Sequence, residues 1–307
     1  MPLQGLFRTT PSPREAKVSF SPPFYFPLPN RFPGCAALRD NLLPMTADLL
    51  PLLDMKNVSV ARGNNLALQN VSLRIQQGEH LCILGPNGSG KSTLIKTITR
   101  ECYPLVRDDG SISILGQERW NIFELRSLLG IVSPDLLAAC TSQATGLDVV
   151  LSGFFSSTRI FPNHQPLLEQ RERAEAALAR LHVAHLANRP VGQMSSGEAK
   201  RTLIARALAH DPQTLLFDEP GNALDIAGQV ELRDTVRALA ASGLGILLVT
   251  HHVHEIIPEM ERVVLLQNGR VMADGPKELL LSDERLSALF GVPVKIFPEG
   301  GYFHLHA

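Results

Sequence analysis

The sequence has few cysteines, few aromatic residues and almost no net charge. Its 307 residues include four cysteines, one tryptophan and three tyrosines, and the formal net charge is −1. Cys35, Cys82, Cys102 and Cys140 form no C-x-x-C pair and have no histidine at metal-ligand spacing, so we expect idle thiols in a reducing compartment. Because nucleic-acid-binding domains usually carry a basic excess, no nucleic-acid partner is expected.

Long hydrophobic runs are also missing. The longest apolar stretch in the globular part, residues 238–250, is interrupted by Ser242, Gly243 and Gly245. It is shorter than the roughly 18–20 residues that a membrane-spanning helix needs, so we predict no transmembrane helix. Hydrophobic residues nevertheless make up 44% of the chain, which is enough to build a globular core.

Residues 1–48 differ from the rest of the chain because they are rich in proline. Prolines this dense break both helices and sheet ladders. Three interpretations stay open: a targeting segment, a disordered arm, or upstream sequence that is not translated, with Met45 as the true start. We favour the third, because regular patterning begins only near Leu53.

From Leu53 onward, strand-like and helix-like patterns alternate. Strands are predicted at residues 58–60, 68–75, 80–84, 111–115, 129–133, 214–217, 246–249 and 262–266. Helices are predicted at residues 91–100 and within a helical region at about residues 146–210, and hairpin turns at Asn268-Gly269 and Gly300-Gly301. This alternation predicts an α/β core with a mostly parallel sheet, into which the helical region is inserted.

A glycine-rich segment between an apolar strand and a helix fits the pattern G-x-x-x-x-G-K-[ST]. It consists of Gly85, Pro86, Asn87, Gly88, Ser89, Gly90, Lys91, Ser92 and Thr93. Such glycines let backbone N–H groups approach phosphate oxygens, and the helix directs its positive end toward the anion. Lys91 would reach the β- and γ-phosphates and the Ser92 hydroxyl would bind Mg²⁺, so the segment predicts nucleotide binding.

Two acids, Asp218 and Glu219, end the apolar strand at residues 214–217. Charges at the carboxyl edge of a parallel strand face the ligand crevice. Asp218 would hold Mg²⁺ opposite Ser92, mostly through water, and Glu219 would orient or deprotonate the attacking water. Taken alone, the same pair is also compatible with a strand that meets a solvated turn.

The segment Met194-Ser195-Ser196-Gly197-Glu198 precedes a good helix former. A serine and a glycine at the start of a helix form either an anion site or a plain helix cap. Beside the phosphate loop and the acidic strand, this segment resembles the L-S-G-G-Q signature of ABC-type ATPases. Ser195 and Gly197 match it directly, whereas Met194, Ser196 and Glu198 replace Leu, Gly and Gln.

The resemblance covers about residues 53–275. It implies a P-loop NTPase core with an antiparallel β subdomain and an inserted helical signature subdomain at about residues 135–210. The ATPase domain is expected at residues 49–297, and residues 298–307 form a C-terminal tail that completes a hairpin.

The resemblance also implies a head-to-tail dimer, most simply a homodimer. Each ATP would lie between the phosphate loop of one subunit and the signature of the other, formed by Ser195, Ser196, Gly197 and Glu198. The loop that contains Asp225 would cross the dimer interface. His251 would contact the γ-phosphate and hold the attacking water together with Glu219.

Two positions depart from the family pattern. Arg62 stands where many members have an aromatic residue that stacks on adenine, although a guanidinium can also stack on a base. Pro134 stands where the family has a glutamine that touches Mg²⁺, and Gln143 could substitute only if its loop folds back. The second departure bears more on coupling to a membrane partner than on ATP hydrolysis.

The resemblance implies Mg²⁺-dependent ATP hydrolysis that energises an ABC transporter together with transmembrane permease subunits. The chain would then be cytoplasmic and peripheral on the inner membrane. Residues 147–155 and 287–294 resemble importer subunits for metal chelates or molybdate, which favours a metal chelate or an oxyanion as cargo. The alternative is a soluble ABC ATPase that acts as a conformational motor in repair, translation or regulation. Lys91, Glu219 and His251 argue against a regulatory module without turnover.

Overall fold

The computed structural model describes residues 50–306. The three interpretations of residues 1–48, including a start at Met45, concern residues outside this range. Within residues 50–306, no helix combines the length and the apolar character needed to cross a membrane.

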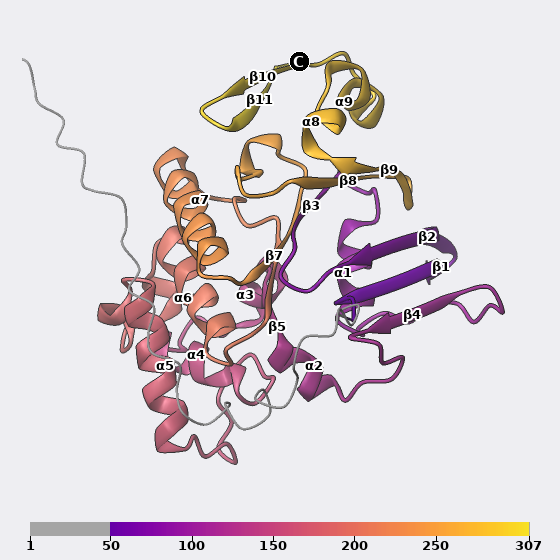
Figure 1. Ribbon diagram of the computed structural model, residues 1–307. Helices are drawn as coiled ribbons and strands as arrows, with labels where there is room; N and C mark the ends of the chain where they lie inside the picture. Colours follow the sequence, from indigo (N-terminus) through magenta and orange to yellow (C-terminus); the bar gives the residue numbers. More distant parts are fainter. Residues whose placement is uncertain (1–49, 307) are drawn as a thin grey trace, which may run out of the picture. The chain divides into compact units, whose positions relative to one another are not determined.

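A six-stranded sheet forms the centre of the fold (Figure 1). Its order is β5 (Leu129–Val132), β6 (Thr214–Asp218), β7 (Gly245–Thr250), β3 (His80–Leu84), β8 (Arg262–Gln267) and β9 (Arg270–Pro276). The first five strands are parallel, and β9 pairs with β8 in the antiparallel sense after the predicted Asn268-Gly269 turn. The mostly parallel sheet predicted from the sequence is therefore confirmed.

The two faces of this sheet carry different parts of the core. Along β3, Leu81 and Ile83 pack on one face, whereas Cys82 and Leu84 pack on the other. Both faces of a central parallel strand are covered, so β3 is an almost continuous apolar run. The buried Cys82 thiol has a pKa raised well above its usual range by this burial, and it is inert packing material, as expected for an idle thiol.

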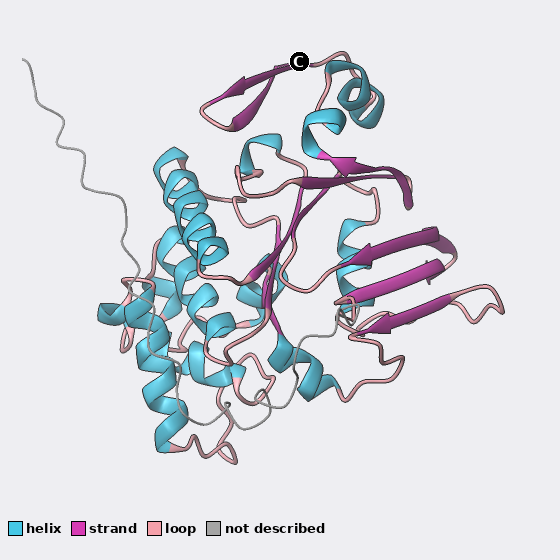
Figure 2. Ribbon diagram, in the orientation of Figure 1, coloured by secondary structure: helices cyan, strands magenta, loops and turns pink. Residues whose placement is uncertain are grey.

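One face is covered by a small antiparallel sheet and by α1, as Figure 2 shows. The sheet has the order β2 (Asn65–Ile75), β1 (Leu53–Arg62) and β4 (Ser111–Ile114). Helix α1 was predicted for residues 91–100 but spans Lys91–Ile98. It ends early because Arg100 has a φ of +61° and its guanidinium donates to the carbonyl oxygens of Ile112 and Glu118.

The other face is covered by helices. They are α4 (Gly146–Gly153), α5 (Leu168–Arg180), α6 (Ser196–Leu208), α7 (Ile226–Ala241) and α9 (Asp283–Phe290), with the short α8 (Lys277–Leu280) beside β9. Between β5 and β6 the chain is helical, and this region begins with α3 (Pro134–Ala139). Helix α2 (Ile122–Leu128) was not predicted, because Leu125 is its one buried residue and no apolar period marks it.

A hairpin follows α9, as predicted around Gly300 and Gly301. Strands β10 (Lys295–Glu299) and β11 (Tyr302–His306) pair in the antiparallel sense. Strand β11 packs against the short 3₁₀ helix η4 (Val253–Glu255), which comes shortly after β7. The Arg233 guanidinium stacks on the Tyr302 ring at 4.7 Å and donates to the His254 carbonyl, so it ties the hairpin to this segment.

Candidate functional site

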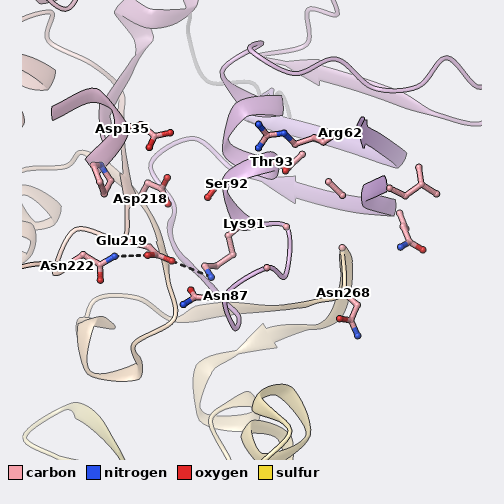
Figure 3. Close-up of a pocket in the computed structure, with 17 residues that line it drawn as sticks. Arg62, Asn87, Lys91, Ser92, Thr93, Asp135, Asp218, Glu219, Asn222 and Asn268 are labelled. Atoms are coloured by element: carbon pink, nitrogen blue, oxygen red, sulfur yellow. Dashed lines mark hydrogen bonds and ion pairs between the residues drawn. The ribbon is translucent and has the colours of Figure 1, made fainter. Parts of the chain in front are cut away.

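A cleft of about 720 Å³ lies where β3 and β6 end and α1 begins (Figure 3). Its walls come from the phosphate loop, the acidic end of β6, the first turn of α3, the antiparallel sheet and the β8–β9 turn. The cleft is therefore at the carboxyl edge of the parallel strands, where α/β sheets bind ligands.

The glycines of the phosphate loop are required by close backbone contacts. A side chain at Gly85 would collide with the carbonyl oxygen of Leu266, and Gly90 has a φ of +105° that other residues avoid. The loop is pinned from outside as well, because the Gly269 N–H donates to the Ser89 carbonyl at 2.8 Å. The β8–β9 turn thus fixes the shape of the loop.

Lys91 is almost fully buried and points along the loop. Its Nζ donates to the carbonyl oxygens of Gly85 at 2.8 Å and Pro86 at 3.0 Å, and it lies 3.4 Å from Glu219 Oε1. A buried ammonium needs such partners, because an unpaired one is expensive. Phosphate oxygens could compete for the same donor, which suits a lysine that binds an anion.

The two acids at the end of β6, Asp218 and Glu219, differ in their environments. Burial, the charge of Glu219 and that of Asp135 raise the pKa of Asp218 to about 6. Burial acts to raise the pKa of Glu219 too, but a hydrogen bond from Asn222 and the nearby His251 and Lys91 outweigh it and lower that pKa. Lys91 and Lys96 act to lower the pKa of Asp218 but do not outweigh burial and the neighbouring acids, whereas Glu219 is held as a carboxylate.

Glu219 is placed by its backbone and by three side chains. Its φ is +46°, and its N–H donates to the Val249 carbonyl at 2.8 Å. The Asn222 amide donates to Oε2 at 2.6 Å, while His251 Nδ1 and Lys91 Nζ lie 3.1 Å and 3.4 Å from Oε1. The side chain is thereby fixed at the mouth of the cleft beside Lys91, as Figure 3 shows.

His251 follows β7, as predicted, and contacts Glu219, but it does not line the cleft. The expected contact with a γ-phosphate stays a prediction. The His252 ring lies tilted beside that of His251, 3.8 Å away between ring centroids, and the His254 ring lies 5.1 Å from that of His252. Neither His252 nor His254 is among the residues that line the cleft.

The signature segment lies at the start of α6, outside the cleft of its own chain. Ser195 caps the helix in a capping box: its Oγ accepts from the Glu198 N–H, and Glu198 accepts from the Ser195 N–H at 2.8 Å. This backbone hydrogen bond, together with the Ser195 hydroxyl and Arg189, lowers the pKa of Glu198. No atom would crowd a side chain at Gly197, and Ser195 and Ser196 are exposed, so the approach to these three residues is open.

Asp225 is the cap of α7 and accepts from the Gly228 N–H at 2.8 Å. The next residue, Ile226, is 83% exposed, and Val230, one helical turn further on, is 42% exposed. An isoleucine this exposed at the start of a helix has no packing role in its own chain.

Both departures from the family pattern are visible in the cleft. Arg62 lines it together with Leu66, and no aromatic side chain of the described residues does so. Pro134 begins α3 and also lines the cleft, but Gln143 is exposed and lies outside it, so the proposed substitution by Gln143 is not realised.

Asp135, Asn222 and Asn268 are cleft residues that the sequence reasoning missed. Asp135 could have been noticed as an acid directly after the altered Pro134 position. Nothing in the sequence near Asn222 indicated its contact with Glu219.

Ser92 and Asp218 are the residues that could hold a magnesium ion. No group of three histidine, cysteine or acidic side chains suited to a metal occurs within residues 50–306. A hydroxyl and a carboxylate in one cleft nevertheless suit Mg²⁺, which usually keeps several waters and takes further oxygens from phosphates. The raised pKa of Asp218 fits a carboxylate that a cation would stabilise.

Comparisons with known proteins identify the family. Residues 68–222 match the family model described as ABC transporter. An uncharacterised ABC transporter ATP-binding protein of Bacillus subtilis is 32% identical over 80% of this chain and 93% of its own length. The cobalt import ATP-binding protein of Rhodobacter capsulatus is 33% identical over 80% of this chain and 85% of its own.

Solved structures agree with this assignment. A structure of a metal-chelate type ABC transporter in an inward-facing conformation matches with a TM-score of 0.68 and 27% identity, over 83% of this chain and 96% of that one. The dimeric structure of a bacterial ABC transporter cassette matches with a TM-score of 0.60 and 28% identity, over 73% and 98%. The chain therefore belongs to the ABC transporter family, as an ATP-binding subunit with the P-loop fold of an ATPase.

Proposed function

We propose that two copies of this chain form a head-to-tail dimer that hydrolyses ATP with Mg²⁺ and thereby energises a transporter. The observation that carries the proposal is that the expected site residues lie in two separate places on the chain. Lys91, Ser92, Asp218 and Glu219 line one cleft, whereas the signature segment lies outside it with an open approach. A second copy that brings its signature to this cleft would complete the site, and a solved bacterial cassette of similar fold is dimeric.

Each residue then has a role that follows from its chemistry. The phosphate-loop residues 85–93 hold the phosphates through backbone N–H groups, and Lys91 adds a positive charge. Ser92 and Asp218 hold Mg²⁺, which neutralises charge on the β- and γ-phosphate oxygens when it is bound. Glu219 orients the attacking water and accepts its proton, which suits a carboxylate that neighbouring donors keep ionised.

The remaining site residues act across the dimer or through Glu219. Ser195, Ser196, Gly197 and the start of α6 offer an anion site to the partner's nucleotide. Asp225 holds the loop that carries Ile226 toward the partner, where the exposed isoleucine would be covered. His251 is a positioning residue, because its contact is with Glu219.

The finer assignments form part of the same proposal. Residues 49–297 form the ATPase domain with its helical subdomain at about residues 135–210, and residues 298–307 end the C-terminal hairpin. The partners are transmembrane permease subunits, and the chain works peripherally on the cytoplasmic face of the inner membrane. The cargo is a metal chelate or an oxyanion, in line with the names of the cobalt-import relative and the metal-chelate structure.

ATP turnover and dimer formation test the proposal together. Glu219→Gln should reduce Mg²⁺-dependent turnover by about 100-fold or more, because general bases contribute at least this much. With ATP the same variant should accumulate as a dimer in light-scattering measurements. Glu278→Gln, which changes an exposed acid on α8 outside the cleft, serves as the control and should behave like the wild type.

The second candidate, a soluble conformational motor, is favoured by Pro134 at the position of the family's glutamine. A permease gene beside the gene for this chain, and stimulation of ATP turnover by that permease in nanodiscs, would support the transporter. Turnover that no neighbouring permease changes would favour the soluble motor.

A further inference from the structure

Asp135 is an acidic residue in the nucleotide cleft that no part of the family pattern accounts for. It stands directly after Pro134 in the first turn of α3, where the Ser133 hydroxyl accepts from the Leu136 N–H at 3.2 Å and caps the helix. This turn is fixed, because proline suits the first helical position and serine suits the cap. The Asp135 side chain is 79% exposed, yet it lines the cleft together with Ser92 and Asp218.

A lysine on α1 pairs with the Asp135 carboxylate. Lys96 Nζ donates to Asp135 Oδ2 at 3.1 Å, and Lys96 belongs to α1, the helix that begins with Lys91 and Ser92. Asp135 therefore links the first turn of the helical region to the helix that would bind the phosphates. Figure 3 shows the carboxylates of Asp135 and Asp218 beside one another, with Ser92 across the cleft.

The electrostatics point in the same direction. Asp135 is near enough to Asp218 that its negative charge adds to burial and to Glu219 in raising the pKa of Asp218. Lys91 is already engaged by two carbonyl oxygens and Glu219, and Lys96 is engaged by Asp135. This side of the cleft thus has an excess of negative charge that a bound cation would relieve.

We infer that Asp135 is a further positioning residue for the metal ion that accompanies the nucleotide, and that its negative charge sets how strongly nucleotide binding depends on Mg²⁺. The inference rests on the proposed function, because the metal is that of the bound nucleotide. It assigns to a carboxylate from α3 a task that Pro134 cannot perform, since proline has no polar side-chain group. Through Asp135, the helical region would then take part directly in the Mg²⁺-dependent binding of the nucleotide.

Fluorescent ADP (the N-methylanthraniloyl derivative) measures this dependence without turnover. Its affinity is determined for the full chain over a series of Mg²⁺ concentrations and in EDTA. In Asp135→Asn, which keeps the shape and removes the charge, the Mg²⁺ concentration at half-maximal enhancement should rise about three- to tenfold, because one nearby charge is lost. The affinity in EDTA should stay equal or increase, since a charge that repels the phosphates is gone.

Three control variants separate this role from a structural one. Asp135→Glu keeps the charge and should keep the wild-type Mg²⁺ dependence. Lys96→Met removes the ion pair but leaves the carboxylate, so the half-maximal Mg²⁺ concentration should not rise. Asp109→Asn removes an exposed acid that pairs with Arg107 outside the cleft, and it should change nothing.

An unchanged Mg²⁺ dependence in Asp135→Asn would overturn the inference, and so would equal weakening of binding with Mg²⁺ and in EDTA. Lys96→Met that reproduces Asp135→Asn would overturn it too, because the ion pair would then be what matters. In these cases Mg²⁺-enhanced binding by the wild type would leave the proposed function standing. If the wild type binds no nucleotide, both the proposed function and the inference fail.

Discussion

The hydrogen bond from Asn222 to Glu219 gives the most direct test of how the proposed catalytic carboxylate is controlled. At 2.6 Å it joins an amide to an ionised acceptor whose side chain is 21% exposed. Hydrogen bonds to charged groups contribute about 1.5–3 kcal/mol. Because Glu219 is partly exposed and keeps His251 and Lys91 beside it, we take the lower end, about 1.5 kcal/mol, which corresponds to about tenfold in rate.

Asn222→Ala should therefore lower kcat for ATP about tenfold and leave KM nearly unchanged, because Asn222 acts on Glu219 rather than on the phosphate loop. The loss should also depend on pH. The hydrogen bond helps to lower the pKa of Glu219, so its removal raises that pKa and leaves less carboxylate as the pH falls. The acid limb of the kcat profile should accordingly move to higher pH in the variant.

Steady-state ATP turnover between about pH 5.5 and 9 measures both effects. Asn268→Gly is a suitable control: it also removes an amide that lines the cleft, and it keeps the backbone at a φ of +49° that glycine tolerates. A kcat of Asn222→Ala within twofold of the wild type would refute the reasoning. The same conclusion would follow if the acid limb stayed in place or if KM alone changed.

Three further changes have defined outcomes. Gly85→Ala should lower the free energy of unfolding by about 2–3 kcal/mol in urea titrations because its methyl group meets the Leu266 carbonyl, whereas Gly275→Ala, with open space around it, should be neutral. Arg62→Ala should weaken ATP binding about fivefold in fluorescence titrations if the guanidinium stacks on the base, and an unchanged affinity would exclude that role. Ser195→Ala removes the cap of α6 and should cost about 1 kcal/mol of stability in thermal melts; full stability would show that the capping box contributes nothing.

The parts of the fold that could be predicted are those that local sequence determines. Strand β3 was predicted at its observed bounds, because four of its five residues are buried, on both faces of the sheet, and form a short apolar run. The phosphate loop was predictable because the positive φ at Gly88 and Gly90 and the contact at Gly85 demand glycine. Helix α2 was missed because only Leu125 is buried, which gives too weak a period.

The missed site residues depend on contacts that the sequence does not display. Asp135 lines the cleft and pairs with Lys96, which is far away in the chain. Asn222 reaches Glu219 because the chain turns at Glu219 with a positive φ, which is uncommon for a glutamate. The contact between His251 and Glu219 likewise joins the residues that follow β7 and β6, which neither segment displays by itself.

The strand order has a consequence for synthesis of the protein on the ribosome. Strand β3 precedes the phosphate loop, but its neighbours in the sheet are β7 and β8, which emerge long after it. Three residues from these later segments shape the loop. The Gly85 N–H donates to the Thr250 carbonyl, the Leu266 carbonyl lies against Gly85, and the Gly269 N–H donates to the Ser89 carbonyl. A nascent chain that ends before β7 carries the sequence of the phosphate loop without the partners that shape it. Nucleotide binding is thereby delayed until nearly the whole domain has left the exit tunnel. It is therefore a late event, and it indicates that folding is complete.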